Sequence, residues 1–251
     1  MTKKNSRCIL ARYRADKCAD CSKLCAHRIA LNGLDGASGR VGNSGLPADY
    51  RGITLVNSPA REDQADNYKI FERYAETFSR TEGEGEPVKS LYLWSESPGT
   101  GKTTTAAALI SEWIARDYLG ALKRGEQPRQ FSAYFLDVTE WQKDYNAFNR
   151  PRVPDDIANP AAERYYRAME KAKAAPFAVL DDIGVRKATE NFRADLHSII
   201  NSRVTNTLPS VYTSNLPIEE MARVFDARLY DRIRDQCLAL EFAGESKRGR
   251  R

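Results

Sequence analysis

The residues of this chain best suited to chemistry form one short run around a lysine, Ser95-Glu96-Ser97-Pro98-Gly99-Thr100-Gly101-Lys102-Thr103. The run follows apolar residues at 91–94 and leads into a helical pattern over residues 104–118. A strand, a glycine turn and a helix in this order form a phosphate-binding loop, in which backbone N–H groups and the positive end of the helix dipole converge on a phosphate. The sequence therefore predicts a nucleotide site.

The residues of this loop have distinct expected roles. Gly99 and Gly101 lack the Cβ that would keep a phosphate away from the backbone. Lys102 is expected to reach the β- and γ-phosphates of ATP, and the Thr103 hydroxyl to complete the shell of a Mg²⁺ ion. The predicted nucleotide contacts are Ser97, Pro98, Gly99, Thr100, Gly101, Lys102, Thr103 and Thr104.

Glu96 departs from the usual pattern G-x-x-x-x-G-K-[ST], because it stands where the first glycine is expected. A carboxylate aimed at the phosphates would repel them. We therefore expect the Glu96 side chain to point away from the site.

Two carboxylates follow another apolar run. Asp181 and Asp182 come after residues 177–180, which predict a buried strand. A parallel strand delivers the residues at its carboxyl end to the ligand-binding edge of a sheet. There Asp181 is expected to hold Mg²⁺ through water, and Asp182 to orient or deprotonate the attacking water. Glutamate, with its longer arm, is usual at the second position in such ATPases, so we expect slow hydrolysis.

A further strand is predicted at residues 211–215 and ends in Asn215. The Asn215 amide could hydrogen-bond the γ-phosphate or the attacking water and so report which nucleotide is bound. A plain strand-end turn is the alternative. We favour the functional interpretation, because this strand falls where a sheet neighbour of the Asp181 strand is needed.

Four of the five cysteines crowd the first 25 residues. The spacing C-x2-C-x3-C-x-H suits convergence on one tetrahedral ion, and Zn²⁺ takes four sulfur or nitrogen ligands. Free thiols with a surface histidine, or an iron–sulfur cluster, are the alternatives. The predicted zinc ligands are Cys8, Cys18, Cys21 and Cys25, with His27 as the alternative fourth ligand.

Composition limits the class of protein. The 251 residues carry a formal net charge of +5, which permits binding to a polyanion without requiring it. No apolar run approaches the roughly 18 residues of a membrane span, and no apolar signal core follows the first residues. An odd cysteine count suits metal binding in a reducing compartment better than disulfides. We expect a soluble, cytoplasmic protein with no membrane partner.

Other segments predict the framework around these residues. Five glycines between residues 32 and 49 predict a loop or linker, and residues 61–80 show helical spacing. Residues 53–55 could line the pocket for the nucleotide base, although we favour a role in packing alone. Gly120 is expected to end the helix after the phosphate loop, and residues 146–160 are expected to be irregular.

Two stretches suggest macromolecular partners. Aromatic and basic side chains are mixed between residues 141 and 152, a pattern typical of a surface that grips single-stranded DNA, although core aromatics at a helix end are an equal alternative. Residues 226–234 predict a basic helix whose arginine could complete a neighbouring subunit's site, or simply form pairs along the helix. The aromatic and basic residues are Trp141, Lys143, Tyr145, Phe148, Arg150 and Arg152.

Five motifs, taken in order, resemble those of DnaC/DnaI-type replicative helicase loaders of the AAA+ class: SPGTGKTT, VLDDIG, TSNLP, RLYDRIRD and FAGESKR. The resemblance covers about residues 50–251, and the cysteine-rich start resembles metal-binding regions of some such loaders. It implies an α/β fold, an AAA+ P-loop parallel sheet flanked by helices and lacking a full helical lid, with a small N-terminal zinc-binding segment. The implied domains are a cysteine-rich helicase-docking region with linker, 1–48, and the ATPase domain, 49–251.

The resemblance also implies residue roles. Lys102 and Thr103 match the Walker A motif, and a lysine, Lys247, stands where the family often has an aromatic before the sensor 2 arginine. The other implied roles are Walker B for Asp181 and Asp182, sensor 1 for Asn215, the arginine finger for Arg232 with Arg228 in reserve, and sensor 2 for Arg248.

The function implied by the resemblance is ATP-dependent loading of a hexameric, DnaB-type replicative helicase onto single-stranded DNA. ATP bridged between Lys102 of one subunit and Arg232 of the next would favour a spiral oligomer, and hydrolysis to ADP would remove the bridge. Three alternatives remain. They are an IstB-type transposition ATPase, a non-hydrolysing ATP-bound adaptor, and a small-molecule kinase, which would leave Asn215 and Arg232 without a role.

Overall fold

A five-stranded parallel sheet in the order β2-β3-β4-β1-β5 positions the predicted chemical residues. Its registered pairs include Leu91 with Val211 and Val179 with Val211. Strands β3 and β4 are buried along their whole length, and the residues of β3 before Asp181 are apolar without alternation, as strands of parallel sheets commonly are. The strands are β1 Ser90–Trp94, β2 Ala133–Asp137, β3 Phe177–Asp181, β4 Ser210–Ser214 and β5 Cys237–Glu241.

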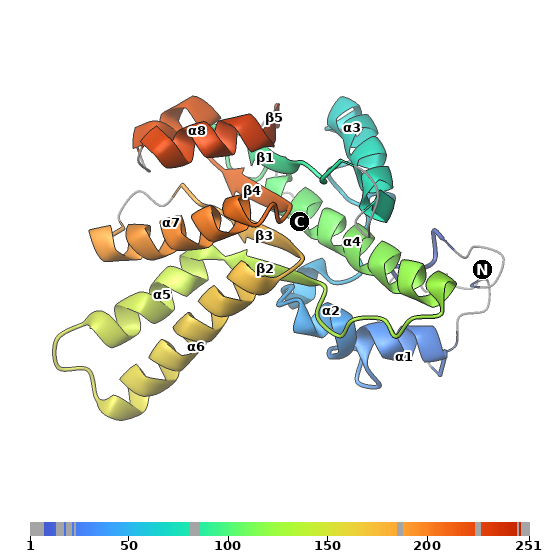
Figure 1. Ribbon diagram of the computed structural model, residues 1–251, viewed down its shortest axis with the longest axis horizontal. Helices are drawn as coiled ribbons and strands as arrows, with labels where there is room; N and C mark the ends of the chain where they lie inside the picture. The colour runs from blue at the N-terminus through green and yellow to red at the C-terminus, as the bar shows by residue number, and fades with distance from the viewer. Residues whose placement is uncertain are drawn as a thin grey trace. The chain divides into compact units, whose positions relative to one another are not determined.

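The computed structural model describes residues 8–13, 18, 22, 24–80, 86–184, 188–223, 227–244 and 246, and Figure 1 shows their helices and strands. The chain divides into two units. One comprises residues 1–88 and 103–134, and the other comprises residues 89–102 and 135–251. The phosphate loop therefore belongs with the sheet, while nearly all of the helix that follows belongs to the first unit. The predicted α/β fold with a parallel sheet flanked by helices is confirmed.

In the second unit, helices α5, α6 and α7 enclose an aromatic core. Trp141 stacks on Tyr165 with ring centroids 4.5 Å apart and packs against Phe192 at 4.8 Å. Trp141 and Tyr145 are only 2% and 8% exposed, so of the two interpretations open from the sequence the core holds for these rings, and they do not form a surface that grips single-stranded DNA. The helices of this unit are α5 Val138–Asn149, α6 Asp155–Ala174, α7 Glu190–Thr205, the 3-10 helix η3 Ile218–Arg223 and α8 Ala227–Gln236.

The rest of the 141–152 pattern divides between core and surface. Phe148 is half-buried and packs edge to face against Tyr165 at 5.3 Å. Lys143, Arg150 and Arg152 are exposed. The basic groups therefore remain at the surface while the aromatic rings support the core.

The predicted irregular stretch at residues 146–160 is mostly helical. Helix α5 extends to Asn149 and α6 begins at Asp155, so only residues 150–154 connect them (Figure 1). Asp155 and Asp156 in the first turn of α6 favour its start through the helix dipole. Pro160 lies inside α6, where its missing N–H removes one backbone hydrogen bond without ending the helix.

Arg203, fully buried near the end of α7, ties several elements of the second unit together. Its guanidinium donates to the carbonyl oxygens of Ala172, Ala175 and Pro209 at 2.7–2.8 Å and to Ser210 Oγ at 2.7 Å. These partners come from the ends of α6 and from the start of β4. Burial of the charge is therefore offset by four hydrogen bonds from the guanidinium.

The first unit is built around α4, the helix that follows the phosphate loop. The predicted apolar stripe is confirmed, because Leu109, Ile110, Trp113 and Ile114 are all buried. Gly120 does not end the helix, which continues to Arg124 and stops at a glycine of positive φ, residue 125. The helices are α1 Ala26–Asn32, α2 Gly39–Asn43, η1 Ala48–Tyr50, α3 Ala65–Glu76, η2 Thr77–Arg80 and α4 Lys102–Arg124.

Residues 8–13 pack onto α4. Ile9 and Leu10 are 2% and 1% exposed. The Tyr13 hydroxyl donates to the buried Glu112 carboxylate and accepts from Arg116 Nε at 3.0 Å. The start of the described chain is therefore part of the first unit's core.

The glycine-rich stretch predicted as a loop or linker is ordered in the structure. It contains α2, and the buried Arg40 donates to the carbonyl oxygens of Pro128 and Arg129 at 2.9 and 2.7 Å. Gly39, with φ of 67°, lies so close to Leu31 that a Cβ would meet the Leu31 carbonyl oxygen at 2.7 Å. The glycines here serve tight turns and close packing more than freedom of movement. No helix among the described residues is long and apolar enough to cross a membrane.

Candidate nucleotide-binding and hydrolysis site

The phosphate loop joins the end of β1 to the start of α4. Gly99 and Gly101 have φ of 74° and 100°, conformations that strain other residues, so the two glycines are needed for the turn. Lys102 is 8% exposed, and its Nζ donates to the carbonyl oxygens of Ser97 and Ser95 at 3.2 and 3.4 Å. The loop thus holds a buried ammonium group at the first residue of a helix.

Thr100 gives an independent sign that this loop fits a polar ligand. Its Oγ1 is buried and has no hydrogen-bond partner among the described residues. Such a group costs free energy unless a water or a ligand satisfies it. A phosphate oxygen would supply an acceptor for this hydroxyl, so the loop has the chemistry that a nucleotide phosphate needs. Thr103 and Thr104, in the first turn of α4, are half-buried.

The two predicted acidic residues lie at the carboxyl end of β3. Asp181 is 7% exposed, and its Oδ1 accepts a hydrogen bond from Thr213 Oγ1 at 2.6 Å. The backbone N–H of Asp182 donates to the same Thr213 hydroxyl at 2.8 Å. One hydroxyl on β4 therefore contacts both acidic residues.

Asp182 has a left-handed backbone, with φ of 60°. Asp and Asn tolerate this conformation better than longer side chains, because their short polar groups hydrogen-bond locally. The backbone thus gives a physical reason for aspartate where glutamate is usual. The carboxylate is turned toward α5, where its Oδ2 lies 3.5 Å from Thr139 Oγ1, at the long limit of a hydrogen bond.

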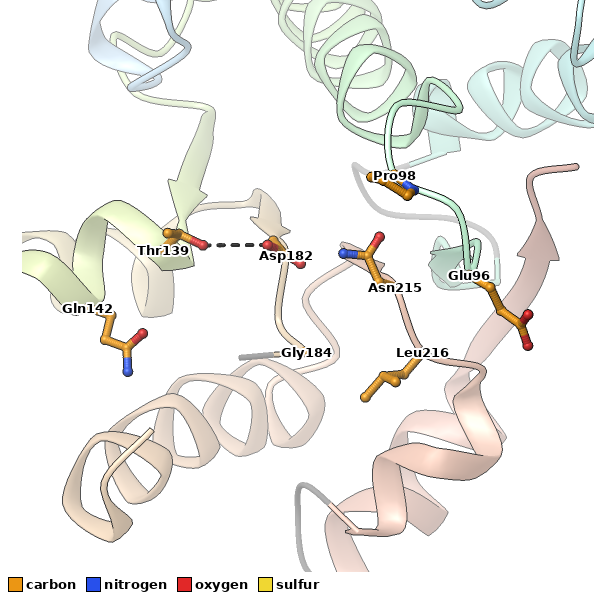
Figure 2. Close-up of a pocket in the computed structure, with 8 residues that line it drawn as sticks. All are labelled: Glu96, Pro98, Thr139, Gln142, Asp182, Gly184, Asn215 and Leu216. Carbon is orange, nitrogen blue, oxygen red and sulfur yellow. Dashed lines mark hydrogen bonds between the residues drawn. The ribbon is translucent and has the colours of Figure 1, made fainter. Parts of the chain in front are cut away.

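An open cleft of about 410 Å³ lies beside these residues (Figure 2). Its lining comes from the segments that follow β1, β2, β3 and β4, which are neighbouring strands of one parallel sheet. Ligands of open α/β sheets bind at this edge, outside the carboxyl ends of the strands. The lining residues are Glu96, Pro98, Thr139, Gln142, Asp182, Gly184, Asn215 and Leu216.

Asn215 lies across the cleft from Asp182, as Figure 2 shows. The turn that carries it is anchored, because the Tyr92 hydroxyl donates to the Leu216 carbonyl oxygen at 2.8 Å and the Leu216 N–H donates to Ser214 Oγ at 3.0 Å. A Cβ at Gly184 would approach Ser214 Oγ to 2.9 Å, so the chain after Asp182 passes close to this turn. The structure therefore brings the predicted amide and one predicted carboxylate to the same cleft.

Glu96 also lines the cleft and is exposed. In Figure 2 its side chain extends away from Asp182 and Asn215. This direction agrees with the expectation that its charge avoids the phosphates.

Thr139 and Gln142 were not predicted from the sequence. They lie three residues apart on α5, so they share one helical face, and both line the cleft. Their position just after a predicted strand could have indicated that they lie at the sheet edge. Asp137 caps α5 by accepting the Glu140 N–H at 2.9 Å, so the residues after Asp137 form the first turn of a helix at that edge.

The predicted arginines are not brought into the cleft by the described residues. Arg232 is exposed on α8 and donates to Asn201 Oδ1 of α7. The side chain of Arg228 and the whole of Arg248 lie outside the described parts of the chain.

The described cysteines do not assemble a metal site. Within the described residues, which include Cys8, Cys18 and Cys25, no group of three or more His, Cys, Asp or Glu could hold a metal ion. Cys21 lies outside the described residues. His27 Nδ1 hydrogen-bonds the Tyr118 hydroxyl at 2.9 Å. The zinc site therefore stays a prediction, and no step below depends on it.

Comparisons with known proteins place this geometry in a fold class. No family model matches the chain. The structure of DnaI is similar over 80% of this chain and 94% of its own, with a TM-score of 0.55 and 22% identity. The DnaC helicase loader is similar over 78% of this chain and 100% of its own, with a TM-score of 0.55 and 17% identity.

Two further proteins share part of their length with this chain. The replication initiator DnaA bound to AMPPCP and single-stranded DNA matches 80% of this chain and 51% of its own, with a TM-score of 0.53 and 17% identity. Subunit RuvB 2 of the Holliday junction branch migration complex of Synechococcus sp. (strain JA-3-3Ab) is 30% identical over 83 residues, 32% of this chain and 22% of that protein. The chain thus spans about a fifth of that curated relative. Together with the sheet order and the cleft, these likenesses show that the chain shares the α/β fold of DnaI, of the DnaC helicase loader and of the matched part of DnaA.

Proposed function

We propose that this protein is an AAA+ ATPase that loads a hexameric replicative helicase of the DnaB type onto single-stranded DNA during DNA replication. The observation that carries the proposal is the cleft at the carboxyl edge of the sheet, where Asp182 and Asn215 face the segment of the phosphate loop. The likeness to DnaI and to the DnaC helicase loader over nearly their whole length supports the choice among AAA+ functions.

ATP and Mg²⁺ are assigned to this site by the chemistry of its residues. The buried Lys102 ammonium suits the phosphates, as does the Thr100 hydroxyl, which has no partner among the described residues. Thr103 with Asp181 suits a Mg²⁺ ion. When bound, Mg²⁺ neutralises charge on the phosphates. Asp182 then orients or deprotonates the attacking water, and Asn215 reads the presence of the γ-phosphate.

We assign to arginines the coupling between ATP bound in one subunit and the neighbouring subunit. Arg232 is exposed on α8 and absent from the lining of its own cleft, as a group that acts on a neighbouring subunit would be. ATP held between Lys102 of one copy and Arg232 of the next favours a spiral of subunits, and hydrolysis to ADP releases it. Arg248 is assigned to the same nucleotide as sensor 2, and Arg228 is the reserve for the finger.

The region of residues 1–48 is assigned to helicase docking and residues 49–251 to the ATPase domain. Basic groups such as Lys143, Arg150 and Arg152 are exposed and suit the backbone of single-stranded DNA, an assignment supported by the likeness to DnaA bound to that ligand.

The test is transfer of the replicative helicase of the same cell onto closed circular single-stranded DNA coated with its binding protein. We expect the intact chain with ATP to increase helicase loading severalfold over helicase alone, and the Lys102→Ala chain to give no increase. ATP turnover measured with and without single-stranded DNA accompanies the assay.

Two results would redirect the proposal. Loading that proceeds without turnover, and equally well with the Asp182→Asn chain, would favour an ATP-bound adaptor. Absence of loading together with ATP-dependent binding to duplex DNA and a transposase would favour the transposition ATPase.

A further inference from the structure

Thr213, on β4, contacts both acidic residues that end β3. Its Oγ1 donates to Asp181 Oδ1 at 2.6 Å and accepts the Asp182 N–H at 2.8 Å. The side chain is 2% exposed, so water does not compete for these bonds. The three groups form a chain in which the Asp182 N–H donates to the hydroxyl and the hydroxyl donates to the Asp181 carboxylate.

The register of the sheet places Thr213 there. Strands β3 and β4 pair in parallel, with Val179 opposite Val211 and Leu180 opposite Tyr212. One more step in the same register sets Thr213 beside Asp181. The Ile183 N–H then donates to the Thr213 carbonyl oxygen at 2.9 Å, so backbone and side chain of Thr213 hold the residues on both sides of the turn.

The hydroxyl matters because of the backbone at Asp182. Its φ of 60° takes residue 182 out of the strand, so its N–H needs an acceptor other than the ordinary strand ladder. A threonine side chain is β-branched and restricted at χ1, so its hydroxyl presents that acceptor from a fixed direction. Valine has the same shape and branching but offers neither acceptor nor donor, and serine keeps the hydroxyl.

We propose that Thr213 is a positioning residue for ATP hydrolysis, which through one hydroxyl fixes the direction of the Asp181 carboxylate and the left-handed backbone that turns Asp182 into the cleft. The inference rests on the proposed function of the same site. Thr213 itself does not line the cleft. Asn215 directly follows β4, so Thr213 joins the strand that leads to this amide to the residues that carry the two carboxylates.

The test compares the full chain with its Thr213→Val and Thr213→Ser variants in three measurements. They are exchange of the Asp182 amide proton by NMR, the dependence of kcat on Mg²⁺ concentration, and the affinity for ATP in excess EDTA. For Thr213→Val we expect faster Asp182 exchange, and a kcat lower and a half-saturating Mg²⁺ concentration higher by about 10- to 100-fold, the usual effect of removing a group that orients a ligand. ATP affinity in EDTA should change by less than about twofold, because Lys102 and the loop are untouched. Thr213→Ser should stay close to the parent in all three.

Several outcomes would overturn the inference. A Thr213→Val chain with parental kcat and Mg²⁺ dependence would do so, as would a loss of ATP affinity in EDTA that parallels the loss of kcat in both variants, which would indicate a general folding defect. Unchanged Asp182 exchange in Thr213→Val would also overturn it, even in a chain that hydrolyses no ATP. The parent chain could show no turnover while Thr213→Val still shows the expected changes in Asp182 exchange and in Mg²⁺-dependent ATP binding. That result would contradict the proposed hydrolysis but support the role of Thr213 in positioning the two acidic residues.

Discussion

At the scale of single residues, the site depends on conformations that few side chains accept. Asp182 combines a carboxylate with a left-handed backbone at φ of 60°. Asparagine shares both the shape and the tolerance for this backbone, whereas glutamate shares the charge but tolerates it less well. Substitution of Asp182 by asparagine therefore tests the role of the charge, and substitution by glutamate tests the effect of the backbone conformation.

Asp182→Asn should lower kcat by about 100-fold or more while ATP and Mg²⁺ affinities stay within about threefold, because a base is lost and no backbone strain is added. Asp182→Glu should instead lower the free energy of unfolding by about 1 kcal/mol, the order of the strain at such a position. Stopped-flow turnover, nucleotide titration and urea unfolding measure these effects. Parental turnover in the Asp182→Asn chain would remove Asp182 from the mechanism.

Lys102→Ala should weaken ATP binding by about 100-fold, since a buried charge–phosphate contact is removed. Lys143→Ala is the matched control. Lys143 is an exposed lysine that pairs with Glu140 and does not line the cleft, so its loss should change affinity by less than about twofold. Titration with a fluorescent ATP analogue compares the two, and equal affinities would show that the loop does not bind the triphosphate.

At the scale of elements, the residues of the candidate site lie where strands end and where helices begin. The phosphate loop, the acidic pair and the strand before Asn215 were predicted from local patterns, because a glycine turn or an apolar run is visible within ten residues of sequence. Thr139 and Thr213 were missed, since Thr139 follows β2 and Thr213 lies on β4. Both strands neighbour β3 in the sheet but are distant from it in the sequence.

Errors at this scale have a common physical origin. The mixture of aromatic and basic residues left Trp141 and Tyr145 open to two interpretations, a DNA-gripping surface or the core. Helices α6 and α7 bring Tyr165 and Phe192 against these rings, so they belong to the core. The glycines of residues 32–49 were predicted as a loop or linker, whereas Gly39 and Gly42 lie so close to neighbouring carbonyl oxygens that a Cβ would meet them at 2.7 and 2.3 Å. Tertiary partners, which no local pattern reveals, decide both cases.

Arg203→Met should lower the free energy of unfolding by about 3 kcal/mol or more, because the variant leaves buried carbonyl oxygens of Ala172, Ala175 and Pro209 without this donor. Arg167→Ala is the control, since Arg167 forms an exposed pair with Glu163 on α6 and its loss should cost less than about 0.5 kcal/mol. Urea unfolding gives both values. Similar values for the two variants would contradict the structural role of Arg203.

At the scale of the whole molecule, the chain's start is tied to the helix that leaves the phosphate loop. Glu112 of α4 is 2% exposed and bonds Tyr13, and Ile9 and Leu10 are buried in the same unit. The region proposed for helicase docking, residues 1–48, therefore includes side chains that pack against α4.

A chain beginning at Asp49 should unfold at least about 5 °C below the intact chain, because it loses this buried apolar surface and leaves Glu112 without Tyr13. Tyr13→Ala should give a smaller decrease in the same direction. Differential scanning calorimetry provides the comparison. An unchanged Tm in the shortened chain would show that residues 1–48 contribute no stability.

Assembly is the second whole-molecule question. Arg232→Ala should reduce ATP-dependent self-association and turnover by about tenfold or more, as loss of an arginine finger does. Arg234→Ala is the matched control on the same helix, because Arg234 is exposed and pairs with Asp231 and Asp235. Sedimentation velocity with ATP and Mg²⁺ distinguishes them, and equal behaviour of the two variants would contradict action of Arg232 in a neighbouring subunit.

The measurement that tests the central claim most directly is size-exclusion chromatography with light scattering of the full chain mixed with the replicative helicase of its own cell. The account predicts a complex of defined mass in ATP and Mg²⁺ that changes in mass or dissociates when ATP is replaced by ADP, and that does not respond to nucleotide in the Lys102→Ala chain. Elution of the two proteins as separate species in ATP, with the chain shown to bind the nucleotide, would contradict the helicase-loader proposal.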